Sequence, residues 1–190
     1  MSHYFLAIDA GGTKTHAIVT DEKGNILGVA RNGAGNWENI GLAKTASSLQ
    51  EVISSALQSS GIDRSQLTRS LFAMAGADWP SDIAMLEKML LELGIPQPVT
   101  VVNDAVGALF AGTPQGIGVV SIAGTGGKTV ARDNQQLLQT MGMSLGEAGG
   151  AGQLVSEFVN LMAAAYHGQR KKTDFYSTVV SHCGFTTDQE

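Results

Sequence analysis

This 190-residue sequence has candidate catalytic and ligand-binding residues in three short turns, each of which follows an apolar segment. The turn Asp9–Lys14 reads Asp-Ala-Gly-Gly-Thr-Lys, the turn Asn103–Ala105 reads Asn-Asp-Ala, and the turn Gly124–Gly127 reads Gly-Thr-Gly-Gly. A mostly apolar run, typical of a buried strand, precedes each of them. Glycines, hydroxyls and carboxylates at the ends of strands suit phosphate groups and Mg²⁺ better than they suit a plain core.

Glycine-rich turns can bind phosphate through their main-chain amides. Glycine has no Cβ, so its N–H group can approach a ligand closely and its backbone can adopt a positive φ. Successive N–H groups then form a concavity for anions. Hydroxyl groups and a lysine ammonium in the same turns add further donors. The predicted phosphate-binding residues are Gly11, Gly12, Thr13, Lys14, Gly124, Thr125 and Gly126.

Asp9 is the predicted ligand of Mg²⁺, either directly or through a water molecule. Mg²⁺ binds through one or two carboxylates, several waters and the phosphates of a substrate. A cap at the end of the first strand is the alternative role of Asp9. For Asp104, a structural role is the N-cap of a following helix, because an aspartate at this position suits such a cap.

Composition narrows the kinds of protein that this sequence can encode. Hydrophobic residues make up 43% and charged residues 15%, which is compatible with a sizeable core. A net charge of −5 disfavours nucleic acid as the main partner. The single cysteine, Cys183, excludes an intrachain disulfide. No apolar stretch approaches the roughly 18 residues of a membrane span, and nothing resembles a signal peptide, so we expect a soluble cytoplasmic protein without a membrane partner.

Periodicity predicts an α/β fold in the first part of the chain. The first predicted strands are joined by short loops and form an antiparallel meander. Each later strand follows a helix, which is the order of parallel strands added to such a meander. Strands are expected at 3–9, 15–20, 26–30, 71–75 and 99–102, and helices at 42–57, 80–93 and 105–111.

A second part of the chain is predicted to follow a linker at 113–116. Strands at 118–123, 128–132 and 136–140 resemble the opening meander of the first part. A glycine-rich loop at 142–152 contains Glu147 and leads into a predicted helix at 153–166. The face of this helix that we expect to be buried carries Leu154, Phe158, Leu161, Met162 and Ala165.

The motifs, taken in order, match one protein family. On them the chain resembles the BadF/BadG/BcrA/BcrD-type ATPase family, which includes N-acetylglucosamine and glucosamine kinases and belongs to the actin-like sugar kinase superfamily. The resemblance extends over roughly residues 4–165. Its motifs are Asp9–Thr13, Gly35–Trp37, Ala75–Asp78, Asn103–Ala105, Ala123–Gly126 and Leu145–Gly150.

The resemblance implies two ribonuclease-H-like lobes with ATP and Mg²⁺ between them. Residues 1–112 would form the first lobe, a β-meander with added parallel strands, and residues 117–190 the start of a similar second lobe. Members of the family are about 300 residues long, so we expect the second lobe to be incomplete here. The turns at Asp9 and Gly124 would be the two phosphate loops.

The resemblance also implies roles for individual residues. Asp104 falls on the position of the catalytic base, which takes the proton of a sugar hydroxyl as its oxygen attacks the γ-phosphate. Asn36 and Glu147 fall on positions that contact the sugar, although Asn36 is equally consistent with a turn residue. Asp78 either lines the same cleft or caps the helix that follows it.

Two motifs depart from the pattern of the kinases. Gly127 replaces a serine that commonly ends the second phosphate loop. In the sugar-contacting loop, Glu147 and Ala148 replace an Asp-Glu pair. Alanine supplies no carboxylate and glutamate is longer than aspartate, so the identity of the sugar stays open.

The predicted function is therefore ATP-dependent phosphorylation of an amino sugar or related hexose, and a homodimer is a further expectation. One alternative is an ATPase that activates a dehydratase, which requires a cluster bridged by cysteines of two subunits. Cys183 alone is available for such a cluster. A second alternative is a non-catalytic remnant that binds a nucleotide or a sugar.

Overall fold

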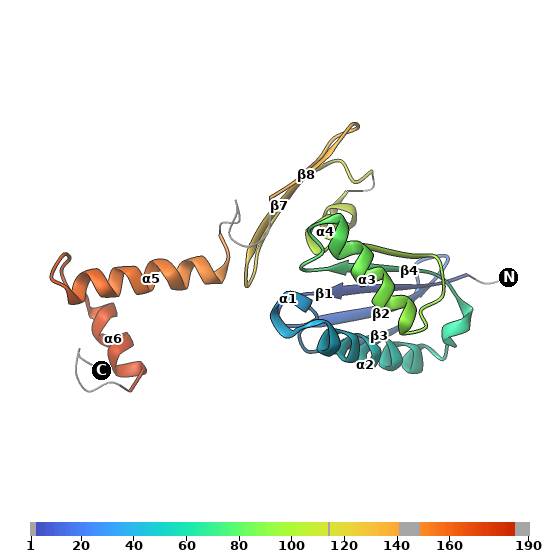
Figure 1. The fold of residues 1–190 in the computed structure, drawn as a ribbon, viewed down its shortest axis with the longest axis horizontal. Coiled ribbons are helices and arrows are strands. Elements are labelled where there is room, and N and C mark those ends of the chain that lie inside the picture. The colour runs from blue at the N-terminus through green and yellow to red at the C-terminus, as the bar shows by residue number, and fades with distance from the viewer. Residues whose placement is uncertain (1–2, 114, 141–148, 185–190) are drawn as a thin grey trace.

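The computed structural model describes residues 3–113, 115–140 and 149–184 (Figure 1). Its larger sheet has five strands in the order β3-β2-β1-β4-β5. The first three strands pair antiparallel, and β4 and β5 run parallel to β1, which confirms the predicted α/β arrangement. The strands are β1 (Tyr4–Ala10), β2 (Thr15–Asp21), β3 (Ile26–Asn32), β4 (Leu67–Met74) and β5 (Val99–Asn103).

Helices α2 (Leu42–Ser60) and α3 (Pro80–Glu92) cover one face of this sheet. Their apolar stripes pack on alternate residues of the strands, including the fully buried Phe72 of β4. Gly61 ends α2 with a left-handed backbone (φ 69°). Pro80 occupies the first turn of α3, where its missing N–H group costs no hydrogen bond.

Helix α4 (Asp104–Gly112) lies on the opposite face and contacts both sheets of the molecule. Gly107 permits its close approach to β4, because a Cβ at this position would lie 2.6 Å from the Cβ of Ala73. Leu109 of α4 belongs to the same small apolar cluster as Val130 of the second sheet. One short helix therefore connects the two sheets.

The second sheet is an antiparallel meander in the order β6-β7-β8. Its strands are β6 (Gly118–Ala123), β7 (Gly127–Arg132) and β8 (Leu137–Gln139). Helices α5 (Ala151–Tyr166) and α6 (Asp174–His182) follow and lie away from the five-stranded sheet (Figure 1). Two short elements, α1 (Trp37–Ile40) and the 3₁₀ helix η1 (Arg64–Gln66), complete the described secondary structure.

The prediction that α5 buries one face is wrong for Leu154 and Leu161 and is confirmed for Ala165. Leu154 is 71% exposed and Leu161 is also exposed, while Ala165 is buried. Of the described elements, α6 contacts the middle of α5, through the edge-to-face rings of Phe158 and Phe175 at 5.1 Å. The amphipathic pattern specified the helix correctly, but burial requires a neighbouring element as well.

Smaller differences concern boundaries and unpredicted helices. Strand β4 begins at Leu67 rather than at 71, and α6 forms in a segment for which we predicted no element. Residue Glu147, predicted to contact the sugar, lies outside the described residues. Of the helices that the structure describes, none has the length and apolar character needed to cross a bilayer.

Gly28 of β3 provides a test of the packing of α2 on the sheet. A Cβ at Gly28 would lie 2.4 Å from the carbonyl oxygen of Ala56 and 2.7 Å from the amide nitrogen of Ser60. We expect Gly28→Ala to lower the free energy of unfolding by about 1–3 kcal/mol, because backbone must move. Urea denaturation measures this change.

The matched control is Gly33→Ala, since a Cβ at Gly33 meets no atom within 4 Å. Its effect should stay within about 0.5 kcal/mol. Equal effects of the two substitutions would contradict the described packing of α2 on β3.

Candidate active site

A cavity of about 1010 Å³ lies where the two sheets meet. Segments far apart in the sequence line it: the turn after β1, the turn after β4, the start of α4 and the turn after β6. All the described residues that the sequence predicted for the site are among its lining residues. They are Asp9, Gly11, Gly12, Thr13, Lys14, Asn36, Asp78, Asp104, Gly124, Thr125 and Gly126.

The two glycine-rich turns face each other across this cavity. Each joins two antiparallel strands, since Ala10 pairs with Thr15 and Ala123 pairs with Gly127. A Cβ built on Gly12 would lie 3.8 Å from the Oγ1 of Thr125, which measures how close the turns are. The fold therefore brings the two predicted phosphate loops to one place.

The main-chain amides of both turns are only partly used by hydrogen bonds within the turns. In the first turn Gly11 N donates to Lys14 O at 2.9 Å, and in the second Gly124 N donates to Gly126 O at 2.9 Å. The amides of Thr13 and Thr125 make no hydrogen bond to any described residue. Such amides can serve a bound anion.

The glycines of these turns do not have a left-handed backbone. Gly11, Gly12, Gly124 and Gly126 all have φ outside the left-handed region, so the freedom of glycine to adopt a positive φ is not used here. A Cβ at Gly12 would approach the Nδ2 of Asn39 to 3.4 Å and would stand in the gap between the turns. A small residue keeps that gap open to a ligand.

The N-terminus of α5 supports the second turn. The amide of Ala151 donates to Gly124 O at 2.8 Å, and that of Gly152 donates to Thr125 O at 3.2 Å. Gly150 packs so tightly that a Cβ there would lie 2.3 Å from the carbonyl carbon of Gly126. The positive end of the α5 dipole therefore lies directly beside the predicted phosphate loop.

Asp104 is the first residue of α4 and lines the cavity. The N-cap of α4 is Asn103, whose Oδ1 accepts a hydrogen bond from Ala105 N at 2.9 Å, so the alternative of Asp104 as the N-cap is wrong. Burial raises the pKa of the Asp104 carboxyl above its usual value, and the nearby carboxylates of Asp9 and Asp78 raise it further. The Ala105 amide and the Lys128 ammonium act in the opposite direction.

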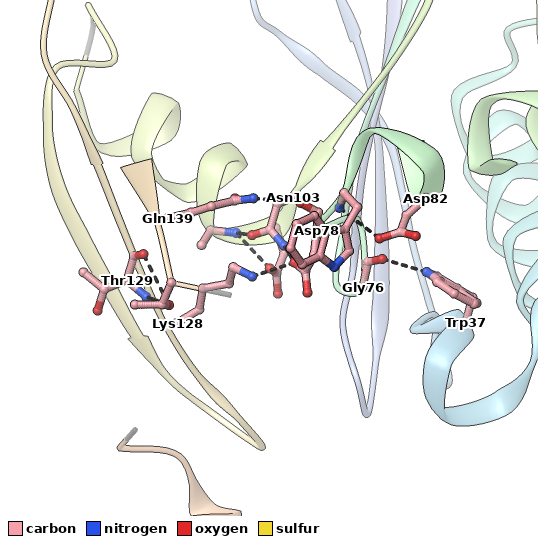
Figure 2. A network of polar contacts seen from close by, with 12 residues as sticks. Trp37, Gly76, Asp78, Asp82, Asn103, Lys128, Thr129 and Gln139 are labelled. Carbon is pink, nitrogen blue, oxygen red and sulfur yellow. Dashed lines mark hydrogen bonds and ion pairs between the residues drawn. The ribbon is translucent and has the colours of Figure 1, made fainter. Parts of the chain in front are cut away.

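Asp78 does not cap α3, because Asp82 Oδ2 accepts from Trp79 N at that helix start (2.9 Å). Its carboxylate instead forms an ion pair with Lys128, whose Nζ lies 2.5 Å from Asp78 Oδ1 (Figure 2). The Nδ2 of Asn103 donates to the same oxygen at 2.8 Å. Lys128 was not predicted from the sequence, although a lysine directly after a glycine-rich turn was a usable signal.

Asn36 is the N-cap of α1, since its Oδ1 accepts from Glu38 N at 3.0 Å. Its Nδ2 makes no hydrogen bond to a described residue, so a cap and a ligand contact are compatible. Trp37 Nε1 donates to Gly76 O at 2.8 Å and joins α1 to the turn after β4. Gly76 has φ 79° and would clash with Asn36 Oδ1 if it carried a Cβ, which explains the glycine at this position.

Asp9 presents an exposed carboxylate to the cavity. Its side chain is 66% exposed, and its Oδ2 lies 3.9 Å from the Nδ1 of His16 across the strand pair. Among the described residues no group of three or more His, Cys, Asp or Glu side chains forms a metal site. A single carboxylate fits Mg²⁺ that also takes waters and substrate phosphates, and it does not fit a fully protein-ligated metal.

The two sheets and the cavity between them define an α/β fold of the actin-like ATPase type. Two solved structures of proposed N-acetylglucosamine kinases share this fold. The protein from Chromobacterium violaceum aligns with a TM-score of 0.73 at 19% identity, covering 95% of this chain and 64% of that one. The protein from Porphyromonas gingivalis aligns with a TM-score of 0.71 at 21% identity, covering 98% and 64%.

The chain belongs to the BadF/BadG/BcrA/BcrD ATPase family, whose sequence model matches residues 6–186. It is 30% identical over 132 residues to the N-acetylmuramic acid/N-acetylglucosamine kinase of Clostridium acetobutylicum, covering 70% of this chain and 43% of that protein. It is 31% identical over 164 residues to the N-acetyl-D-glucosamine kinase of Dictyostelium discoideum, covering 81% and 49%. The chain thus spans about half the length of the curated relatives that it matches.

The raised pKa of Asp104 makes a prediction about stability. A carboxyl whose pKa is higher in the folded state destabilises the fold once it is ionised, so its penalty appears as the pH rises above the unfolded-state value. The melting temperature of the Asp104→Asn variant minus that of the wild type should therefore increase as the pH rises from about 4 to about 7. Thermal melts across this range measure the difference, and a loss that grows with pH would contradict it.

Proposed function

We propose that this protein is an ATP-dependent kinase that transfers a phosphoryl group to a hydroxyl of an amino sugar. One observation carries the proposal: Asp104 and the two glycine-rich turns line a single cavity. A carboxylate there can accept a proton beside amides that can bind a polyphosphate. The two curated relatives, both named as kinases of N-acetylated amino sugars, support the same class of substrate.

ATP would bind with its phosphates between the two turns. The amides of the turns at Gly12 and Thr125 would donate to phosphate oxygens, and Lys14 would add a positive charge. The N-terminus of α5 contributes its dipole on the same side. Because these donors are fixed by the surrounding hydrogen bonds, they need little reorganisation as charge develops on the phosphates.

Asp104 would act as the general base. The sugar oxygen forms a bond to the γ-phosphorus while the bond from that phosphorus to the β,γ-bridging oxygen breaks, and ADP leaves. The hydroxyl proton passes to the carboxylate of Asp104. A pKa above the usual aspartate value strengthens the carboxylate as a proton acceptor.

Mg²⁺ would be held by Asp9, directly or through water, together with phosphate oxygens of ATP. When bound, it would offset negative charge on the transferring phosphoryl group. The exposed carboxylate of Asp9 meets this requirement on the side of the cavity that holds the first turn.

Sugar contacts are assigned to Asn36 and Glu147. Asn36 lines the cavity, and its side-chain amide nitrogen has no partner among the described residues. We propose the acceptor only as a class, the amino sugars of the two relatives, because the loop with Glu147 lacks the paired carboxylates of the kinase pattern.

Substitution of the base tests the proposal directly. This chain, and any longer natural form, should release ADP from ATP and Mg²⁺ when the right hexosamine of a panel is added. Asp104→Asn should lower this rate by about 10²–10⁴-fold, because the proton acceptor is lost. The acid limb of the pH–rate profile of the wild type should lie above the usual pKa of aspartate.

The control for this experiment is Asp133→Asn. It makes the same chemical change at an exposed turn where an amide oxygen can still accept the hydrogen bonds of Gln135 and Gln136. ADP release that ignores every sugar would indicate an ATPase. Nucleotide binding without turnover would indicate a binding protein.

The support of the second turn by Gly150 gives a prediction on affinity. Gly150→Ala should displace the backbone of Gly126 and weaken ATP binding by about tenfold or more, the loss of one to two good hydrogen bonds. Gly152→Ala is the matched control in the same helix turn, since its Cβ would lie at an ordinary 3.6 Å from Thr125 O. Titration calorimetry distinguishes the two, and equal affinities would contradict a phosphate site in this turn.

A further inference from the structure

We propose that Lys128, Asp78 and Asn103 form a latch between the two sheets that positions Asp104 for proton transfer. The inference rests on the proposed kinase function and adds to it a positioning role for Lys128. The latch consists of the Lys128–Asp78 ion pair and the Asp78–Asn103 hydrogen bond (Figure 2).

The contacts of the latch run from the second sheet to the start of α4. Lys128 of β7 pairs with Asp78 Oδ1 at 2.5 Å, and the same oxygen accepts from Asn103 Nδ2 at 2.8 Å. The other end of the Asn103 amide, Oδ1, accepts from Ala105 N at 2.9 Å and caps α4. Asp104 lies between these two residues in the chain, so the latch fixes the helix start that carries it.

A second contact fixes the same turn to the same sheet. Gln139 of β8 donates its Nε2 to the carbonyl oxygen of Asp78 at 3.0 Å (Figure 2). The turn after β4 is therefore held by both its main chain and its side chain. Movement of the second sheet would pull on Asp78 at two points.

The alternation of side chains along β7 explains why the side chain of Lys128 reaches the site. Lys128 and Val130 are on the same face of β7, because side chains alternate along a strand. Val130 packs on Ala105, Val106 and Leu109 of α4, so this face of β7 meets the helix that begins with Asp104. A charged residue two positions before Val130 must then find its partner next to that helix.

The burial of the pair indicates a positional role. The side chains of Lys128 and Asp78 are 9% and 6% exposed. Desolvation of two charges offsets much of their attraction, so such a pair is weak evidence for stability and is best attested as a device that fixes geometry. Removing one partner alone would leave a buried charge uncompensated.

The charges of the latch also affect the ionisation of Asp104. Asp9 and Asp78 both oppose ionisation of Asp104, and the Lys128 ammonium favours it. Withdrawal of Lys128 would leave two carboxylates facing Asp104 without this cation. The position of β7 against α4 therefore favours the ionised form of Asp104.

The test is a set of variants in the active protein. Lys128→Met should lower kcat for sugar phosphorylation by about 10–100-fold, the effect expected of a misplaced catalytic group. The KM for ATP should change little, and the acid limb of the pH–rate profile should move to higher pH. Hydrogen exchange of residues 103–109 should become faster, because the cap of α4 is loosened.

Two further variants keep the test decisive. Lys88→Met is the control, since Lys88 is a 79% exposed lysine in a surface pair with Glu92 and should leave every readout unchanged. The double variant Lys128→Met with Asp78→Asn removes both charges and leaves no buried ion unpaired. It should fold even if Lys128→Met does not, and it should still show the reduced kcat and the faster exchange.

The outcomes separate the latch from the kinase function. Unchanged kcat, pH profile and exchange in the Lys128 variants of an active kinase would overturn the latch and leave the kinase standing. A lower melting temperature with an unchanged pH profile and kcat would also overturn it, because it would show a structural role alone. If the wild type phosphorylates no sugar, the kinase proposal fails, and exchange at 103–109 alone decides whether Lys128 holds the start of α4.

Discussion

The packing of α4 between the two sheets is the constraint on which the site depends. Gly107 allows the helix to approach β4, and Leu109 packs with Val130 of β7. A larger residue at 107 would push the helix away from the first sheet, and with it Asp104. Because the glycine-rich turns belong to different sheets, the geometry of the cavity depends on this helix contact.

Much of the fold followed from local sequence. The apolar runs around Leu6, Phe72 and Val101 have strand length, and the stripes of α2 and α3 have helical spacing, so elements and their order could be predicted. The turns that contain Gly12 and Gly124 could be predicted too, because paired glycines directly after an apolar run mark a strand end. Strand order then brings the ends of β1 and β4 together without further information.

What the sequence did not reveal depends on contacts between distant segments. The pairing of Lys128 with Asp78 joins residues 50 positions apart, and no local pattern specifies it. The N-cap of α4 was assigned to Asp104 as an alternative, whereas Asn103 holds it, because either residue type suits a cap and only geometry decides. The exposure of Leu154 shows the same limit, since periodicity defines an apolar face but not the neighbour that covers it.

The balance of charge in the cavity links its carboxylates to the groups that could bind phosphate and a metal ion. Asp9, Asp78 and Asp104 place carboxylates where a polyphosphate would bring more negative charge, and Asp104 already has a raised pKa there. Lys128 pairs with Asp78, and we expect Lys14, the amides of the two turns and the N-terminus of α5 to attract the phosphates of a ligand. A metal ion on Asp9 would relieve the same excess, because it would lower the negative potential felt by both the phosphates and the base. In the proposed kinase, nucleotide, metal and base would therefore be coupled through one electrostatic environment, and the proton affinity of Asp104 would be a property of that environment as much as of its own carboxyl group.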